Sequence, residues 1–328
     1  MSVVFLFPGQ GAQIVGMGRD LYEAYAAARR VFDEAEAATG LPLKRFCFEG
    51  PEEELARTDV CQPAIFTVSA ATLAVLGELL GDEAPAEVCP AYAAGLSLGE
   101  YTALYAADAV DLQPAVQLVA RRGQLMQAAA VAVPSAMVSV FGLAEPRARE
   151  LVEAASQGQT LTCANFNCPG QIVISGAAEA CRRAEQMAGD FGAKMAVMLK
   201  VAGAFHSEIM APAAAELSEA LEAVAFRTPG LPVVANVDAR PYESLQQVPG
   251  KLLAQLTGAV RWQQSMEFLL ASGVRRFYEI GPGRVLAGLM RRIDRSAKVT
   301  SLNSRQALER AVGGLLAEAQ VEPELAND

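Results

Sequence analysis

The chain has 328 residues, of which 52% are hydrophobic and 20% charged, which is typical of a globular α/β protein large enough for two packed units. The formal net charge of −10 argues against a general nucleic-acid-binding protein. Six cysteines form no CxxC pair and only one histidine accompanies them, which argues against a zinc site or a disulfide framework. The start of the chain lacks the features of a signal sequence, and the uncharged stretch 60–77 contains several polar residues. We therefore expect a cytoplasmic protein without a membrane span.

Strands alternate with helices in the first part of the chain. Residues 3–7 are apolar and β-rich and end at Pro8-Gly9, which is typical of a buried strand entering a loop. The patterns then predict helices at 19–38 and 62–80, a strand at 91–95 and a helix at 98–107. This alternation favours a largely parallel sheet covered by helices on both faces.

The middle of the chain has a different order of elements. Strands are predicted at 136–141, 161–166, 171–175 and 194–201, with helices at 145–155 and 179–191. This β-α-β-β-α-β order predicts a small ferredoxin-like domain at 133–201, inserted into a large domain made of 1–132 and 202–328. The large domain resumes with a helix at 210–224, a strand at 231–236, helices at 247–257 and 263–272, a strand at 276–280 and a final pair of helices.

Gly95-Leu96-Ser97-Leu98-Gly99 fits the G-x-S-x-G pattern of a nucleophile elbow. A sharp turn from strand to helix needs glycine on both sides, because a Cβ there would collide with neighbouring backbone. The turn would present the Ser97 hydroxyl at a helix N-terminus, where backbone N–H groups stabilise developing negative charge. Because the pattern also occurs by chance, the preceding apolar strand and the following helix are needed to support a nucleophile over a helix-capping serine.

His206 is the single histidine of the chain. A serine that attacks an acyl group needs a nearby base, so His206 is the predicted partner of Ser97. It follows the predicted small domain directly, where the chain returns to the large one, and such junctions often form clefts. An Asp, a Glu or a backbone carbonyl could orient its ring, and the residues alone leave that choice open.

Several ordered motifs resemble one family, the malonyl-CoA:acyl carrier protein transacylases of fatty-acid synthesis and the related acyltransferases of polyketide synthesis. The motifs are Phe7-Pro8-Gly9-Gln10-Gly11, Gly-Leu-Ser-Leu-Gly-Glu-Tyr from 95, Arg122-Gly123 with Met126-Gln127, Asn165-Phe166-Asn167 with Pro169-Gly170-Gln171, Gly203-Ala204-Phe205-His206-Ser207 and Glu279-Ile280-Gly281-Pro282-Gly283. They cover nearly the whole chain. The resemblance implies an α/β-hydrolase-like large domain beside the ferredoxin-like one.

The resemblance also implies roles for individual residues. Ser97 would be the acylated nucleophile and His206 its base, with Gln10 and the backbone N–H of Leu98 as the oxyanion hole. Gln255 would offer a backbone carbonyl to the histidine. Arg122 would bind the free carboxylate of the malonyl group, since a guanidinium grips a carboxylate bidentately. Asn165 is expected in the substrate site.

Two positions bear on selectivity. The family often has histidine directly before the nucleophile, whereas this chain has Leu96. Because that histidine is not the base, the chemistry need not fail. Phe205 resembles the malonyl-selecting members, whose aromatic ring leaves little room for an α-methyl group. One methyl is worth only about 1–3 kcal/mol, so the residues leave open how strictly methylmalonyl-CoA is rejected.

We therefore expect a ping-pong transfer of malonyl from malonyl-CoA to the phosphopantetheine thiol of acyl carrier protein, supplying fatty-acid synthesis, with no metal or cofactor. The alternatives are a polyketide acyltransferase acting in trans, a proofreading hydrolase of acyl-carrier thioesters and a non-catalytic scaffold. An acidic carrier could dock on the basic stretch that includes Arg275, Arg276, Arg284, Arg291 and Arg292. A solvated helix face is the competing interpretation of that stretch. The family's usual state implies a monomer.

Overall fold

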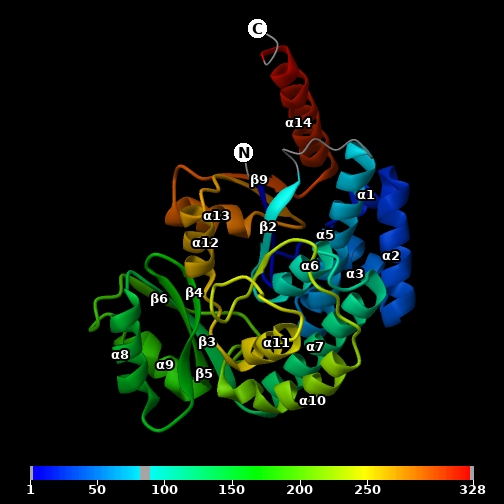
Figure 1. The fold of residues 1–328 in the computed structure, drawn as a ribbon. Helices are drawn as coiled ribbons and strands as arrows, with labels where there is room; N and C mark the ends of the chain where they lie inside the picture. The colour runs from blue at the N-terminus through cyan, green and yellow to red at the C-terminus, as the bar shows by residue number, and fades with distance from the viewer. Residues whose placement is uncertain (1–2, 82–88, 326–328) are drawn as a thin grey trace.

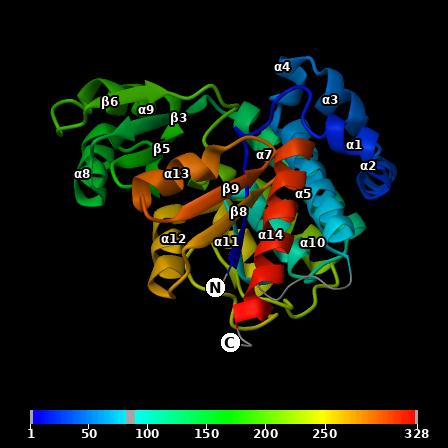
Figure 2. The same ribbon diagram turned by 90° about the horizontal axis from the view of Figure 1, so that it is seen from above.

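The computed structural model describes residues 3–81 and 89–325, and it contains two separate sheets. The larger sheet has five strands in the order β7-β2-β1-β8-β9, and every neighbouring pair in it is parallel. Its strands are β1 (Val3–Phe7), β2 (Pro90–Gly95), β7 (Val233–Val234), β8 (Arg276–Ile280) and β9 (Lys298–Leu302). The fold is therefore mixed α/β, with a parallel sheet at its centre (Figures 1 and 2).

The central strand β1 explains how the parallel sheet is covered. All five of its residues are buried, and they alternate between two apolar clusters. Val3, Phe5 and Phe7 belong to the large cluster formed with α2 (Ala26–Thr39), α5 (Thr58–Leu80) and α7 (Leu112–Ala132). Val4 and Leu6 pack with α12 (Trp262–Ala271) and α13 (Val285–Ile293) on the other face. Helices thus cover both faces, as the apolar strand predicts.

The smaller sheet is antiparallel, with the strand order β4-β5-β3-β6. Two helices accompany its four strands. In chain order the unit consists of β3 (Ser135–Phe141), α8 (Glu145–Ser156), β4 (Leu161–Cys168), β5 (Gln171–Ala177), α9 (Ala178–Met187) and β6 (Met195–Met198). Figure 1 shows this unit in green beside the parallel sheet. It lies within 133–201, where the sequence predicts a separate domain, and its element order is the predicted one. The division of the chain into two domains stays a prediction.

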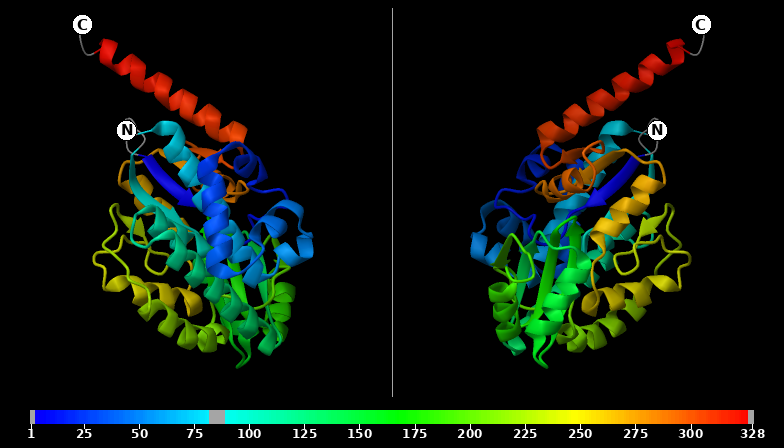
Figure 3. Two further views of the ribbon diagram at one scale, coloured as in Figure 1. Left: turned by 90° about the vertical axis from the view of Figure 1, so that its right-hand side faces the viewer. Right: turned by 90° about the vertical axis from the view of Figure 1, so that its left-hand side faces the viewer.

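The remaining helices lie around the parallel sheet. They are α1 (Arg19–Ala24), α3 (Leu43–Glu49), α4 (Glu52–Leu55), α6 (Leu98–Ala106), the 3₁₀ turn η2 (Glu208–Met210), α10 (Ala211–Glu222), α11 (Gln247–Thr257) and α14 (Arg305–Leu325). Helix α14 extends away from the body of the protein (Figure 3). Helix α5 is long and apolar enough to cross a membrane, but 67% of its most apolar stretch is buried inside the protein, as in the core helix of a globular fold.

The structure departs from the expected elements at several points. The single helix expected at 19–38 is two helices, because Tyr25 is extended, with φ −121° and ψ 135°. The strand expected at 231–236 is reduced to the two residues of β7. The expected final pair of helices is present as α13 and α14, but strand β9, which was not predicted, lies between them and pairs with β8 at the sheet edge.

Candidate active site

Ser97 lies in the sharp turn between β2 and α6. Its backbone has φ 53° and ψ −102°, outside the helical and extended regions. A Cβ on Gly95 would lie 1.9 Å from the backbone of Gly99, and a Cβ on Gly99 would lie 2.1 Å from the Phe7 carbonyl oxygen. Both glycines are therefore sterically required, which explains why the pattern places glycine two residues to each side of the serine.

Asn236, which follows β7, holds this turn from both sides. Its Oδ1 accepts a 2.6 Å hydrogen bond from the Ser97 backbone N–H, and its Nδ2 donates to the Gly95 carbonyl at 2.7 Å. Asn236 is buried. One side chain thus fixes the backbone before and at the serine.

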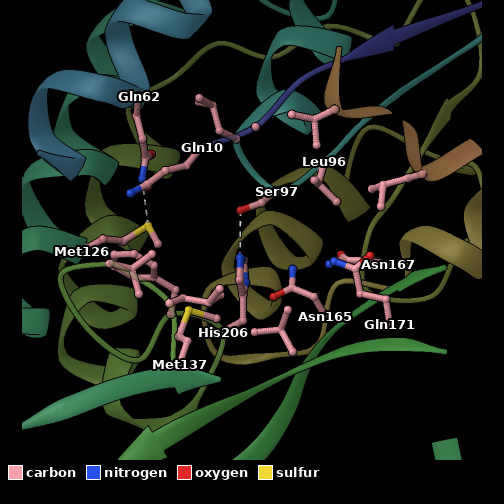
Figure 4. A pocket seen from close by; sticks show the side chains of 18 of the residues that line it. Gln10, Gln62, Leu96, Ser97, Met126, Met137, Asn165, Asn167, Gln171 and His206 are labelled. Carbon is pink, nitrogen blue, oxygen red and sulfur yellow. Dashed lines mark hydrogen bonds between the residues drawn. The ribbon is translucent and has the colours of Figure 1, made fainter. Parts of the chain in front are cut away.

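The side chains of Ser97 and His206 meet (Figure 4). Ser97 Oγ lies 2.8 Å from His206 Nε2, and His206 Nδ1 lies 2.7 Å from the Gln255 carbonyl oxygen. The carbonyl can only accept, so Nδ1 carries the proton and Nε2 accepts from the serine hydroxyl. Among the orienting groups that the sequence left open, the group in contact is a backbone carbonyl, supplied by α11.

His206 is buried, and burial is the main cause that lowers its pKa from 6.5 to about 4. The nearby Arg122 cation lowers the pKa further, while the hydrogen bond to Gln255 raises it. At neutral pH the imidazole is therefore uncharged and can accept a proton.

Arg122, on α7, is completely buried beside the serine. Its Nη2 donates to Ser97 Oγ at 3.0 Å and to Gln255 Oε1 at 2.9 Å, and its Nη1 donates to Gln62 Oε1 at 2.6 Å. All three partners are neutral. Its Nε has no hydrogen-bond partner among the described residues. A buried cation held by neutral groups strongly attracts an anion.

A pocket of about 210 Å³ opens in front of these groups. The parallel-sheet unit supplies Gln10, Leu96, Ser97, Leu98 and Arg122, and also Gln62, Met126, Val285 and Leu289. The smaller sheet and the segment after it supply Met137, Asn165, Asn167, Gln171, Val173, Leu199, Val201, Phe205 and His206. The pocket therefore lies between the two sheets, and all the sequence-predicted catalytic and substrate residues except Gln255 line it (Figure 4). Gln255 is in contact with three of them from behind.

The five arginines of the proposed carrier-binding stretch do not lie together. Arg276 pairs with Val3 at the amino-terminal ends of the strands, and Arg275 precedes it, whereas Ser97 follows the carboxyl end of β2.

The other three arginines lie beside the pocket. Arg284 directly precedes α13, and Arg291 and Arg292 lie in that helix, whose Val285 and Leu289 line the pocket. Arg292 Nη1 also donates to Gln171 Oε1 at 2.8 Å.

Sequence reasoning missed several residues that support the site. They are Asn236, Gln62, Glu100 and Tyr242. Glu100 accepts hydrogen bonds from the Tyr242 hydroxyl and from Gln255 Nε2. Glu100 was visible in the Gly-Leu-Ser-Leu-Gly-Glu-Tyr motif, which placed it three residues after the nucleophile. No local pattern marked the others.

A serine hydroxyl that donates to a neutral, buried imidazole can attack an acyl carbonyl, so the arrangement is that of a serine–histidine acyl-transfer site. Residues 4–317 match the family described as acyl transferase domain. This chain belongs to that family.

The chain is similar to named relatives and to solved structures over nearly its whole length. It is 40% identical over 312 residues to the malonyl CoA-acyl carrier protein transacylase of Bacillus subtilis, covering 95% of this chain and 96% of that one. The acyl-carrier-protein-S-malonyltransferase of Bartonella henselae has a TM-score of 0.91 and 41% identity, over 96% of this chain and 99% of that one. A malonyl-transacylase in complex with its type II PKS acyl-carrier protein has a TM-score of 0.90 and 38% identity, over 96% and 100%.

Proposed function

We propose that this chain transfers a malonyl group from malonyl-CoA to the phosphopantetheine thiol of an acyl carrier protein, through an ester on Ser97. The observation that best supports malonyl as the acyl group is the position of Arg122. This residue is a buried cation with neutral hydrogen-bond partners, and its Nη2 lies 3.0 Å from Ser97 Oγ. The names of the relatives support the same reaction. Acyl carrier proteins of fatty-acid synthesis are the proposed acceptors, and those of polyketide synthesis would need no different chemistry.

In the first half-reaction His206 Nε2 takes the hydroxyl proton as Ser97 Oγ attacks the thioester carbonyl carbon. The tetrahedral oxyanion is stabilised by N–H groups of Gln10 and Leu98, which both line the pocket. The C–S bond then breaks, and coenzyme A leaves as a thiol with the proton from His206. Burial lowers the pKa of His206, so the imidazole is unprotonated before the attack, as a general base must be.

In the second half-reaction the carrier thiol gives its proton to His206 and its sulfur attacks the ester carbonyl carbon. Ser97 Oγ leaves and recovers the proton, which restores the free enzyme. Each step uses only groups of the chain, the malonyl-CoA thioester and the carrier thiol, so the proposal includes no metal or redox cofactor. The result is a ping-pong mechanism.

The substrate would lie with its free carboxylate on Arg122, whose planar guanidinium can grip two oxygens at once. Asn165, which lines the pocket from β4 of the smaller sheet, is the proposed hydrogen-bonding partner of the acyl or pantetheine portion. Phe205 lines the same pocket and would crowd an α-methyl substituent. This arrangement favours malonyl over acetyl by charge and over methylmalonyl by size.

The carrier would dock beside α13, at the mouth of the pocket. Arg284, Arg291 and Arg292 are exposed there, and Val285 is 39% exposed while also lining the pocket. Cations around an apolar contact suit an acidic partner. The proposed carrier-binding surface does not include Arg275 and Arg276, because they lie at the opposite ends of the strands.

We also infer the finer domain description. The strand order β4-β5-β3-β6, with two helices between the strands, supports a ferredoxin-like domain, and the strand–Ser97–helix turn in a parallel sheet supports an α/β-hydrolase-like one. A monomeric, cytoplasmic enzyme remains the expectation from the sequence.

The rival function is hydrolysis, with water in place of the carrier thiol. The two are separated by incubating the enzyme with malonyl-CoA, with and without holo acyl carrier protein, and following coenzyme A release, malonyl-carrier and free malonate. Transfer predicts carrier-dependent turnover with little free malonate, and Ser97→Ala abolishes it. Malonate accumulating at the same rate without carrier would make the enzyme a hydrolase.

A further inference from the structure

Glu100 is a completely buried carboxylate three residues after the nucleophile, on α6. Its Oε1 accepts a hydrogen bond from the Tyr242 hydroxyl. Its Oε2 accepts from Gln255 Nε2 at 2.6 Å and from the Asn236 backbone N–H at 3.2 Å. Three donors from two other segments of the chain therefore converge on one carboxylate, which none of the steps above uses.

Two of those donors belong to residues that hold the reacting groups. Asn236 clamps the backbone at Gly95 and Ser97. Gln255 offers its carbonyl to His206, its Oε1 to Arg122 and its Nε2 to the Ser97 carbonyl at 2.9 Å. Glu100 thus contacts both residues through which the nucleophile, the base and the buried cation are connected.

The orientation of the Gln255 carboxamide is the critical point. Its oxygen must face Arg122, because a guanidinium has only donors. Its nitrogen then faces Glu100, and a carboxylate has only acceptors. A flipped carboxamide would set an NH₂ group against the guanidinium and an oxygen against the carboxylate. Glu100 and Arg122 therefore select one orientation of Gln255 between them.

We propose that Glu100 is a positioning residue for acyl transfer, which fixes Gln255 and Asn236 and, through them, Ser97, His206 and Arg122. The inference rests on the proposed function, since it concerns the same site. Without the carboxylate, three buried donors lose their acceptor and the Gln255 carboxamide loses its preferred orientation. The consequence is a slower acylation step in an enzyme that remains folded.

The test measures single-turnover acylation of Ser97 by malonyl-CoA at pH 8 and well below the melting temperature. Intact protein mass monitors the formation of the acyl-enzyme. Rates are expressed per reactive site, titrated with a fluorophosphonate probe of activated serines. We expect Glu100→Ala to acylate about thirtyfold more slowly or worse. Glu100→Gln should stay within about threefold of the wild type, because its oxygen still accepts from Gln255 while the Tyr242 hydroxyl turns to accept from the new amide.

Two further variants separate positioning from general stability. In Glu100→Ala/Gln255→Ala the two losses should not multiply, because both changes remove the same contact. Thr102→Val is the matched control, since Thr102 is a buried residue of α6 whose hydroxyl has no hydrogen-bond partner among the described residues. It should acylate at the wild-type rate. If Glu100→Ala does not fold, Glu100→Asp replaces it, because the shorter side chain withdraws the carboxylate from Gln255 and should slow acylation several-fold.

An unchanged per-site rate in Glu100→Ala, or losses that multiply in the double variant, would overturn the inference. Failure of the proposed function is distinguishable from this. In that case wild-type Ser97 reacts with the fluorophosphonate but not with malonyl-CoA, and the same comparison among variants is then made with the probe's reaction rate.

Discussion

Ser97 and His206 both have positive φ angles, 53° and 58°, and their side chains meet at 2.8 Å. Such backbone costs on the order of 1–3 kcal/mol per non-glycine residue, so the surroundings must hold it. Asn236 holds the Ser97 turn, and Ser175 Oγ donates to the Phe205 carbonyl directly before His206 at 2.6 Å. Ser175 belongs to the smaller sheet. The pairing of nucleophile and base therefore depends on contacts from both sheets.

Substituting Arg122 should change acyl selectivity more than general reactivity. We expect Arg122→Ala to lower kcat/KM for malonyl-CoA about a hundredfold or more, because the substrate carboxylate loses charge-assisted hydrogen bonds. Arg122→Lys should recover only part of the loss, since it keeps the charge without the planar fork. Steady-state kinetics with malonyl-CoA and acetyl-CoA measure both effects. Arg121→Ala, which removes an exposed ion pair with Glu216, is the neighbouring control. Equal losses for the two acyl groups would contradict the carboxylate role.

Phe205 should limit the size of the acyl group. In Phe205→Ala we expect the ratio of methylmalonyl-CoA to malonyl-CoA use to rise about tenfold or more, because one methyl group in an apolar pocket is worth about 1–3 kcal/mol. Competition between the two substrates, resolved by the mass of the acyl-enzyme, measures the ratio directly. A ratio that stays at the wild-type value would assign the selection to other pocket residues.

Two of the buried ionisable groups of the site, Glu100 and His206, have opposite effects on stability as pH changes. Burial raises the Glu100 pKa from 4.5 to about 7, so its contribution to stability is lost as pH rises across that range. The lowered His206 pKa, about 4 against 6.5, gives a contribution that is lost as pH falls from 6.5 towards 4. Between pH 5 and 7 the two effects oppose each other.

Glu100→Gln should therefore expose the effect of His206. We expect the variant's free energy of unfolding to rise from pH 5 to pH 7 by about 2 kcal/mol more than that of the wild type. Urea denaturation at the two pH values measures the difference, and all other carboxylates are shared by both proteins. The same pH dependence in both would mean that Glu100 is not protonated in this range.

Reversing charge beside α13 should weaken binding of the carrier protein and leave the first half-reaction intact. For Arg284→Glu with Arg291→Glu we expect KM for the carrier to rise about tenfold, since each exposed charge pair is worth up to about 1 kcal/mol. Acylation by malonyl-CoA alone should proceed at the wild-type rate. Arg275→Glu, a single reversal at the opposite end of the strands, is the control and should leave both half-reactions unchanged. An equal rise in KM from Arg275→Glu would mean that the carrier-binding surface also includes the arginines at the other end of the strands.

The sequence predicted those features whose cause is local. The apolar run of β1 and the glycines beside Ser97 follow from burial and steric exclusion within a few residues. His206 followed from being the single histidine. The break at Tyr25 was missed because it is accompanied by a contact 284 residues away, where the Tyr25 hydroxyl donates to Glu309. Strand β9 was missed because Lys298–Leu302 is a short, half-exposed edge strand with little apolar pattern.

The supporting residues of the site were beyond local patterns for the same reason. Asn236 reaches Ser97 across 139 residues, and Gln255 reaches Glu100 across 155. An asparagine after a strand or a glutamine in a helix is ordinary until the fold brings it to the elbow. Gln255 was nevertheless found through the family resemblance, since its motif identified the position whose carbonyl contacts His206.

The proposed transfer depends on an acyl ester on Ser97, and intact protein mass after brief mixing with malonyl-CoA detects that ester directly. We expect one malonyl-sized increment on the native chain, located on the peptide that contains Ser97, and none on Ser97→Ala. His206→Ala should form the ester about 10³-fold or more slowly. Adding holo acyl carrier protein should then discharge the ester onto the carrier. An increment that persists in Ser97→Ala, or transfer to the carrier without any acyl-enzyme, would show that Ser97 does not carry the acyl group.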